Sequence, residues 1–166
     1  AGLEWVFNHS AIRVVNMSLG RDGSLDDNPL LRQAVLALYS SNIVVVVAAG
    51  NDQTKQVSQM VPATYPEVLA VGSTTALAGS NKCRFLGQGI PADTASFFTT
   101  DGAFNDATRI GVTTSAPGED QEDVSNGCFI SSVGILSTKL GGGTTRMSGT
   151  SMASPHVAGI DARIMQ

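Results

Sequence analysis

The stretch Ile43-Val44-Val45-Val46-Val47 decides the fold class, because it is an unbroken run of apolar, β-branched residues. Such a run is typical of a strand buried on both faces, as in a parallel sheet covered by helices. Before it, residues 28–40 begin with Asn28-Pro29, an N-cap residue followed by proline at the first helical position. This pattern predicts a helix that ends near Ser40. Earlier still, residues 12–19 predict a second strand.

Further elements are predicted outward from this core. Residues 1–10 match the end of a helix, and residues 150–165 match a terminal helix. Short apolar runs predict more strands, at 68–71, 110–114 and 133–136. Residues 74–108 lack strong periodicity, so we expect surface loops there with one short strand near 95–98. Strands that alternate with helices predict an α/β fold, a parallel sheet with helices on both faces.

Composition limits the function classes. The 166 residues are 42% hydrophobic and 14% charged, with a net charge of −4. This balance excludes intrinsic disorder and argues against a nucleic-acid partner, which would require a basic face. The longest apolar run, residues 43–50, is far shorter than the roughly 20 residues of a membrane span, so we expect no membrane partner. No signal-peptide pattern is visible at the start of the chain.

The first segment with chemical potential is residues 149–159, Gly-Thr-Ser-Met-Ala-Ser-Pro-His-Val-Ala-Gly. It places Ser151 after a glycine at the start of a predicted helix. Unpaired backbone N–H groups of a first helical turn stabilise negative charge nearby, which suits a nucleophile. The alternative is structural, with Thr150 or Ser151 serving only as the N-cap of the helix.

Two other segments follow predicted strands. Residues 48–51, Ala-Ala-Gly-Asn, come after the central strand, and the Asn51 amide could donate to a developing oxyanion. The alternative is a turn residue, since Asn tolerates left-handed backbone conformations. Ser18-Leu19-Gly20 also ends a strand and could offer backbone groups to an extended peptide, although strands that end in glycine are common.

Together these segments resemble the subtilisin-like serine proteases, the subtilases. The stretch GTSMASPHVAG at 149–159 matches the nucleophile signature of that family at every position, AAGN at 48–51 matches its oxyanion segment, and NMSLG at 16–20 matches its substrate-binding strand. Residues 65–72, YPEVLAVG, and 115–118, SAPG, are also subtilase-like. The resemblance covers nearly the whole chain and implies a subtilisin-like fold.

The resemblance also implies roles for individual residues. Ser151 would be the nucleophile, while Asn51 and the backbone N–H of Ser151 would be the oxyanion donors. One wall of the peptide cleft would be formed by Ser18, Leu19 and Gly20. A second wall would be formed by Ala48, Ala49 and Gly50, whose small size favours a pocket open to a large apolar side chain. The implied reaction is hydrolysis of a peptide or protein substrate through an acyl-enzyme.

Two members of the family's triad are not found in the sequence. Subtilases carry the catalytic Asp in a D-[ST]-G segment and the His in an H-G-T-x-V-A-G segment, and this chain contains neither. His9 is expected to be an exposed helix-end residue and His156 to belong to the nucleophile helix. Asp22-Gly23 and Asp101-Gly102 are interpreted as turn formers. We therefore expect residues 1–166 to form a single partial subtilase catalytic domain that is inactive alone.

An incomplete domain would expose an apolar sheet edge and face. This predicts a complementary N-terminal half, self-association or marginal stability. Two alternatives stay open. One is a non-catalytic module that binds peptides or a protease. The other is one half of a split protease. The terminal helix also departs from the family, with Asp161 and Arg163 where apolar residues are expected.

The sequence gives no confident metal site, and the resemblance implies no required cofactor. Family members often hold a structural calcium, and here the weak candidates are the carbonyls of Ala63, Tyr65 and Val68. The acidic run at 119–123 is interpreted as a solvated loop. The only two cysteines, Cys83 and Cys128, could form a disulfide or remain free thiols. Secretion is expected from the resemblance alone.

Overall fold

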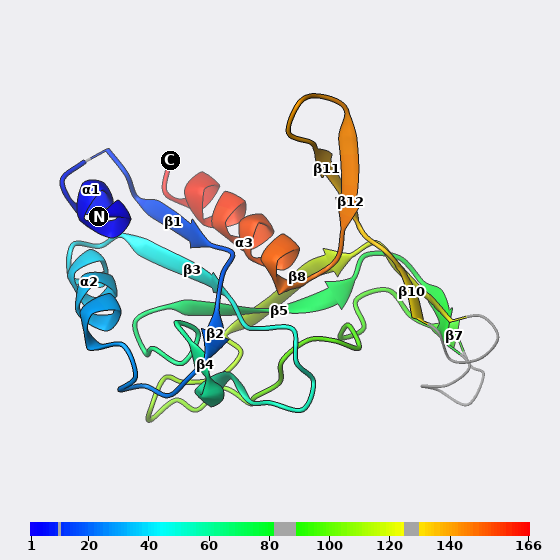
Figure 1. Cartoon of the computed structure of the whole chain (residues 1–166), viewed down its shortest axis with the longest axis horizontal. Helices are drawn as coiled ribbons and strands as arrows, with labels where there is room; N and C mark the ends of the chain where they lie inside the picture. The colour runs from blue at the N-terminus through cyan, green and yellow to red at the C-terminus, as the bar shows by residue number, and fades with distance from the viewer. Residues whose placement is uncertain (10, 82–88, 125–129) are drawn as a thin grey trace.

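Strand β3 (Val44–Ala48) is an inner strand of a four-stranded parallel sheet in the computed structural model (Figure 1). The strand order is β1-β3-β5-β8, with β1 at Val14–Met17, β5 at Leu69–Thr75 and β8 at Thr114–Glu119. The structure describes residues 1–9, 11–81, 89–124 and 130–166. The parallel α/β class expected from the sequence is therefore confirmed.

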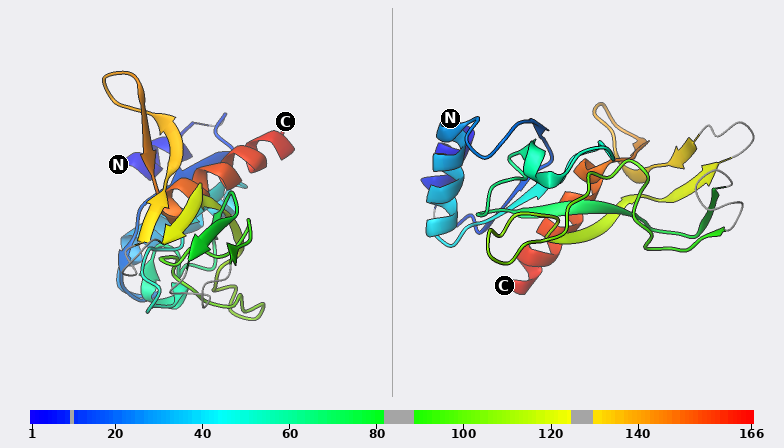
Figure 2. Two further views of the ribbon diagram at one scale, coloured as in Figure 1. Left: turned by 90° about the vertical axis from the view of Figure 1, so that its right-hand side faces the viewer. Right: turned by 90° about the horizontal axis from the view of Figure 1, so that it is seen from below.

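Each face of this sheet carries its own core, because successive residues of β3 point to opposite faces. Val45 and Val47 pack with the helix α2 (Pro29–Ser40), which contributes the buried Val35 and Leu38. Val46 packs on the other face with helix α3 (Thr150–Ile164). Figure 2 shows α3 crossing the strands of the sheet. An apolar run without alternation is needed here because both faces of β3 are buried.

The helix start predicted at Asn28-Pro29 is confirmed in detail. Pro29 is the first residue of α2, and Asn28 Oδ1 accepts a hydrogen bond from the Leu31 N–H at 3.1 Å. The expected terminal helix and the expected strands at 12–19 and 68–71 are also present. A short helix, α1 (Gly2–Phe7), stands beside α2.

The remaining elements are short. A second sheet has the order β10-β9-β6-β7, and β11 and β12 form a hairpin that projects from the body beside α3 (Figure 1). The bounds of these strands are β6 Gly79–Asn81, β7 Gly89–Ile90, β9 Gln121–Val124, β10 Ile130–Val133, β11 Ile135–Thr138 and β12 Thr144–Met147. The two-residue strands β2 (Arg21–Asp22) and β4 (Met60–Val61) pair with each other, and a 3-10 turn, η1 (Val57–Gln59), comes before β4.

Three strand predictions need correction. The strand predicted at 110–114 is wrong, since β8 begins only at Thr114 and Gly111 has a φ of +137°. The run at 133–136 is divided at Gly134 between β10 and β11. A Cβ at Gly134 would lie 2.5 Å from Met147 backbone atoms, so this position requires glycine. Near 95–98, Ala95 makes only an isolated bridge with Thr74.

Two further expectations on exposure and loops are wrong. Residues 74–108 are not only loops, since they include β6 and β7. The acidic run is not a solvated loop, because it lies in β8 and β9, where Glu119 and Glu122 are buried. Cys83 and Cys128 lie outside the described residues. No helix in the described part of the chain is long and apolar enough to cross a membrane.

Candidate active site

Three chain segments far apart in sequence meet beside the first turn of α3. Ser18 follows the end of β1, and Gly50-Asn51 follow the end of β3. Because parallel strands end at the same edge of a sheet, these two segments lie near each other. Ser151 is the second residue of α3, which packs on both strands. The structure thus brings together the three segments that the sequence singled out.

The Asn51 side chain is fixed by Thr150. Asn51 Oδ1 accepts hydrogen bonds from the Thr150 N–H at 2.8 Å and from Thr150 Oγ1 at 3.0 Å. Thr150 Oγ1 in turn accepts from the Gly50 N–H at 3.2 Å. These bonds use Oδ1, the acceptor of the amide, and hold the Asn51 side chain in place. A fixed donor of this kind is what stabilisation of an oxyanion requires.

Ser151 is bonded to Ser18 in both directions. Ser18 Oγ donates to the Ser151 carbonyl at 2.8 Å, and Ser151 Oγ donates to the Ser18 carbonyl at 3.2 Å. The first bond is available because the residue four positions after Ser151 is Pro155, which has no N–H to donate within the helix. A side chain from β1 therefore satisfies a carbonyl that the helix leaves open.

Glycines allow the close approach of the chain before Ser151. The Gly149 N–H donates to the Gly118 carbonyl at 2.9 Å, which links the start of α3 to β8. A Cβ at Gly118 would lie 2.2 Å from Ser73 Oγ and 2.6 Å from the Gly149 carbonyl oxygen. Gly149 has a φ of +153°, a conformation that side chains rarely adopt. Both positions therefore need glycine to place Ser151 against the sheet.

Neither histidine has a hydrogen bond to Ser151. His9 stacks on Trp5 with ring centroids 3.7 Å apart and bonds the Trp5 carbonyl through Nδ1. His156 is exposed, and its Nδ1 lies 2.8 Å from the Met152 carbonyl of its own helix. Both positions agree with the structural roles predicted from sequence. The residues described here thus place no imidazole on the Ser151 hydroxyl.

The acidic candidates are also engaged elsewhere. Asp22 lies in β2 rather than in a turn, and its carboxylate pairs with Lys55, which also lies 3.3 Å from Asp52 Oδ2. Hydrogen bonds from Thr54 hold the pKa of Asp52 below its ordinary value. Asp101 Oδ1 accepts from the Gly102 N–H.

The predicted cleft walls differ in exposure. Leu19 and Gly20 are exposed beyond β1, whereas Ala48, the last residue of β3, and Ala49 after it are buried. Ala49 packs into the core on the α2 face of the sheet. The role of both alanines in substrate binding stays a prediction.

The hydrogen-bonded group of residues around Ser18 and Ser151 is called the serine cluster below. The weak metal candidates are not part of it and lie in the turn before β5. Ala63, Tyr65 and Val68 are buried, and the Tyr65 carbonyl accepts from the Val68 N–H at 3.3 Å. No group of three or more His, Cys, Asp or Glu side chains that could hold a metal ion occurs within the described ranges. Any cation here would therefore rest on neutral carbonyl oxygens.

Sequence reasoning missed two polar residues of the serine cluster. Asn16 Nδ2 donates to Ser18 Oγ at 2.8 Å, and Ser154 Oγ lies 2.9 Å from the same oxygen. The available signal was their position in the sequence: Asn16 lies two residues before Ser18, and Ser154 lies three residues after Ser151. That spacing puts Ser154 near Ser151 on one side of α3.

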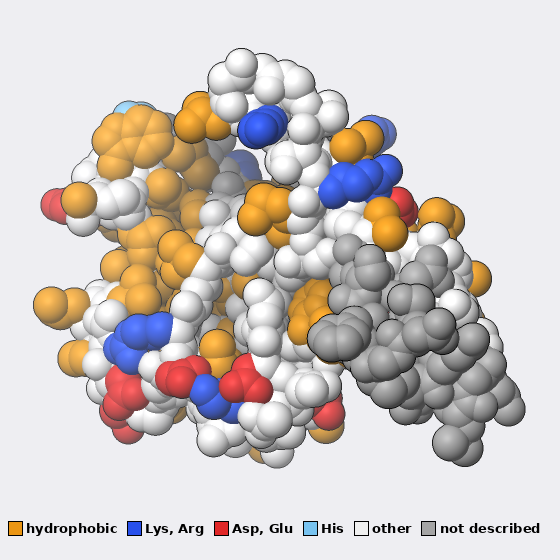
Figure 3. Space-filling view, turned by 45° about the vertical axis from the view of Figure 1, so that its right-hand side comes forward, with side chains coloured by type: hydrophobic (Ala, Val, Ile, Leu, Met, Phe, Trp, Pro, Cys, Tyr) orange, Lys and Arg blue, Asp and Glu red, His pale blue; other side chains and the backbone are white. Residues whose placement is uncertain are grey.

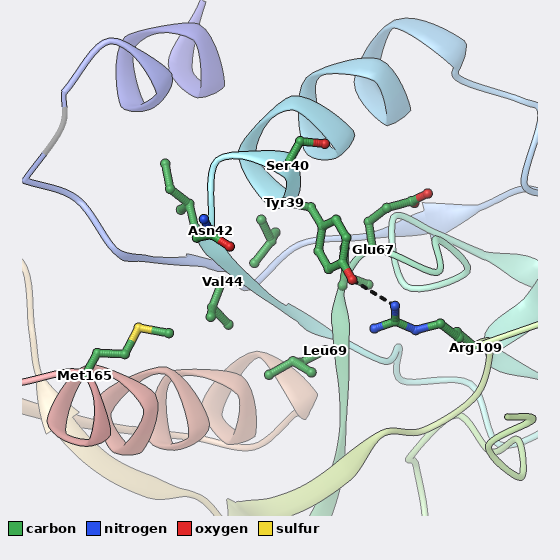
Figure 4. A pocket seen from close by; sticks show the side chains of 11 residues that line it. Tyr39, Ser40, Asn42, Val44, Glu67, Leu69, Arg109 and Met165 are labelled. Atoms are coloured by element: carbon green, nitrogen blue, oxygen red, sulfur yellow. Dashed lines mark hydrogen bonds between the residues drawn. The ribbon is translucent and has the colours of Figure 1, made fainter.

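A cavity of about 470 Å³ lies at the other end of the sheet. It is bordered by the beginnings of β3 and β5 and by the end of α3, and Figure 4 shows Val44, Leu69 and Met165 around it. Arg109 Nη1 donates to the Tyr39 hydroxyl at 2.8 Å at its edge. Of the predicted site residues, only the weak metal candidate Val68 is among those that line this cavity.

Known proteins resemble this chain over nearly its whole length. The model of the subtilase family matches residues 1–166. A subtilisin-like serine protease, AsES, of Sarocladium strictum is 34% identical over 98% of this chain and 33% of its own length. Subtilisin DY of Bacillus licheniformis is 35% identical over 99% of this chain and 46% of its own length. An extracellular protease of Xanthomonas campestris is 35% identical over 95% of this chain and 22% of its own length. The chain therefore spans less than half the length of these relatives.

Proposed function

The chain belongs to the subtilase family, which its whole length matches, and from this premise we propose that it supplies the nucleophile and the oxyanion donors of a serine endopeptidase. The nucleophile is Ser151, and the donors are Asn51 Nδ2 and the Ser151 N–H. The observation that carries this proposal is the pair of hydrogen bonds by which Thr150 holds Asn51 Oδ1, across 99 residues of sequence.

The geometry supports an acyl-transfer reaction. Attack of Ser151 Oγ on a peptide carbonyl would form a tetrahedral intermediate with a negative oxygen. The Asn51 amide and the first turn of α3 would stabilise that oxygen. In subtilisin itself, removal of this side-chain donor slows the reaction by about 10²–10³, a measured value for the family. Collapse of the intermediate would release the amine and leave an acyl group on Ser151.

The reaction also needs a base that accepts the Ser151 proton. In the described structure that proton is directed at the Ser18 carbonyl, and both histidines bond elsewhere. We propose that a complementary segment carrying an Asp and a His supplies the base. Strand β1 is at the end of the strand order, so such a segment can pair along its outer edge. The 166-residue chain alone should therefore hydrolyse peptides poorly.

A second candidate is a peptide-binding module without turnover. The absence of a base on Ser151 among the described residues favours this candidate. The segment Ser18–Gly20, called the cleft strand below, would still bind an extended peptide. A split protease, with Asp and His on another polypeptide, would also use these residues. The substrate in each case is a peptide or protein.

Covalent labelling tests the proposal. The purified chain is treated with a fluorophosphonate, alone and with a synthetic or co-expressed complementary segment, and intact mass is measured. Ser151→Ala is the control. We expect labelling that requires Ser151 and increases at least tenfold with the complement. A folded chain that binds peptide tightly but is never labelled, with or without the complement, would overturn the protease proposal and favour the binding module.

Calcium and secretion remain smaller proposals. A cation held by the carbonyls of Ala63, Tyr65 and Val68 would stabilise the turn before β5. Calcium should then raise the melting temperature relative to EDTA, and equal melting temperatures would reject the site. The extracellular protease among the relatives supports secretion.

A further inference from the structure

We infer that Ser154 is a positioning residue that fixes the cleft strand against the nucleophile, through the hydroxyl of Ser18. Ser154 lies three residues after Ser151 and is 0% exposed. Its Oγ lies 2.9 Å from Ser18 Oγ. The inference rests on the proposed function, because placement of Ser18 matters to a reaction only if Ser151 attacks a substrate.

The directions of the hydrogen bonds follow from counting protons. Ser18 Oγ has one proton, which it donates to the Ser151 carbonyl at 2.8 Å. It also accepts from Asn16 Nδ2 at 2.8 Å. A serine oxygen can accept twice, so Ser154 is left as the donor in the remaining contact. Ser18 Oγ then makes every hydrogen bond available to it, which prevents its hydroxyl from rotating to another partner.

This arrangement fixes the position of the segment around Ser18 relative to Ser151. The proposed reaction depends on that relative position. Ser18 belongs to the segment that would bind the extended peptide, and Ser151 would attack it. Two hydrogen bonds join Ser18 directly to Ser151, and the first depends on the orientation of Ser18 Oγ. Loss of the Ser154 donor would leave a part-buried lone pair unsatisfied and allow Ser18 to reorient. A displacement of about 1 Å can cost ~10²-fold in rate, so even partial loosening should be measurable.

The mechanism predicts coupling between the two hydroxyls rather than a simple loss of stability. If Ser154 acts through Ser18, Ser154→Ala should have little effect once Ser18→Ala has removed its partner. A residue that only stabilises the fold would give effects that add. Thr75→Val is the matched control, because it also removes a buried hydroxyl, one that donates to the Pro91 carbonyl at 3.2 Å.

Hydrogen exchange measured by mass spectrometry on the 166-residue chain tests this coupling without requiring activity. We expect Ser154→Ala to speed exchange several-fold in peptides covering residues 14–20 and 149–154. The double variant should exchange no faster there than Ser18→Ala alone, and Thr75→Val should leave these peptides unchanged. Where Ser154→Ala does not fold, Ser154→Cys leaves no void at this position and weakens the donor. Additive effects, or no local change, would overturn the inference.

Labelling by the fluorophosphonate separates this inference from the proposed function. In the preparation that labels Ser151, the rate constant should fall about tenfold in Ser154→Ala and no further in Ser18→Ala/Ser154→Ala than in Ser18→Ala. An unchanged rate in Ser154→Ala would overturn the positioning role. If the wild-type chain is never labelled, the proposed function fails, and the exchange experiment alone decides whether Ser154 holds Ser18.

Discussion

Ser18 and Ser151, 133 residues apart in sequence, hydrogen-bond to each other twice in opposite directions. The bond from Ser18 Oγ to the Ser151 carbonyl anchors the helix to the strand. The bond from Ser151 Oγ to the Ser18 carbonyl, at 3.2 Å, is longer and occupies an acceptor that an extended peptide would use. In the proposed function, the Ser151 hydroxyl therefore covers part of the segment that would bind the peptide, and peptide binding should release it.

Ser151→Ala should bind an uncleavable peptide at least as tightly as the wild-type chain. The variant frees the Ser18 carbonyl of one hydrogen bond, which is worth ~0.5–1.5 kcal/mol, so the gain should reach up to about tenfold in Kd. Isothermal titration calorimetry with a short apolar peptide measures this, and Thr75→Val provides the unchanged reference. Weaker binding by Ser151→Ala would contradict the competition between hydroxyl and peptide.

Thr150→Val should lower the reactivity of Ser151 while the chain stays folded. Thr150 is fully buried, and its hydroxyl bonds both Asn51 Oδ1 and the Gly50 N–H. Without it, Asn51 keeps only the backbone bond and can turn its donor away from the oxyanion. The bond to Asn51 Oδ1 is worth roughly 1 kcal/mol, so we expect labelling to be about fivefold slower. Thr150→Ser keeps the hydroxyl and should label at near the wild-type rate. Equal rates in both variants would show that Thr150 does not orient Asn51.

Pro155→Ala should stabilise the chain but lower the rate at which Ser151 is labelled. Alanine at 155 restores an N–H that can bond the Ser151 carbonyl within α3, and removal of proline from a helix interior is worth up to ~3 kcal/mol. The new donor competes with Ser18 Oγ for that carbonyl, which weakens the anchor between helix and strand. Thermal unfolding and labelling measure the two effects separately. A more stable variant with undiminished labelling would show that the Ser18 bond is dispensable for reactivity.

Local signals in the sequence were sufficient for β1, β3, β5 and α2. The strand at 43–47 could be predicted without knowing its neighbours. Burial on both faces requires an apolar residue at every position, and the sequence shows this directly. Asn28 and Pro29 likewise act within the first turn of their own helix. The prediction at 110–114 failed because apolar Ile110 and Val112 flank Gly111, whose positive φ prevents a strand.

The parts of the site that were missed depend on contacts across the chain. Ser154 is an ordinary small residue of a helix until Ser18, 136 residues away, meets its hydroxyl. Glu119 and Glu122 have the charge of surface residues, yet the pairing of β8 and β9 with neighbouring strands buries them. The proposed roles of Ser151 and Asn51 could be assigned only because their segments resemble a known family. Their mutual geometry required the folded chain.

The exposed apolar surface near the chain's start gives the partner proposal a physical basis. Trp5 and Phe7 of α1 are at least half exposed, and Figure 3 shows hydrophobic side chains gathered on that side of the molecule. Strand β1 is the neighbouring edge of the sheet. A complementary segment that pairs with β1 would place its own residues beside Ser18, where a base for Ser151 is needed.

Asp161→Asn should stabilise the chain at neutral pH and lose that advantage in acid. Burial raises the pKa of the Asp161 carboxyl above its ordinary value, and its Oδ2 is buried without a hydrogen-bond partner in the part of the chain that the structure describes. The folded chain therefore holds the proton more tightly than the unfolded chain. As pH rises from the unfolded pKa through the folded pKa, ionisation favours the unfolded state, so the penalty is complete at neutral pH and absent below the unfolded pKa. Melting temperatures at pH 7 and pH 3 measure the difference, with the exposed Asp106→Asn as control. A gain for Asp161→Asn that is equal at both pH values would mean that its charge is not the cause.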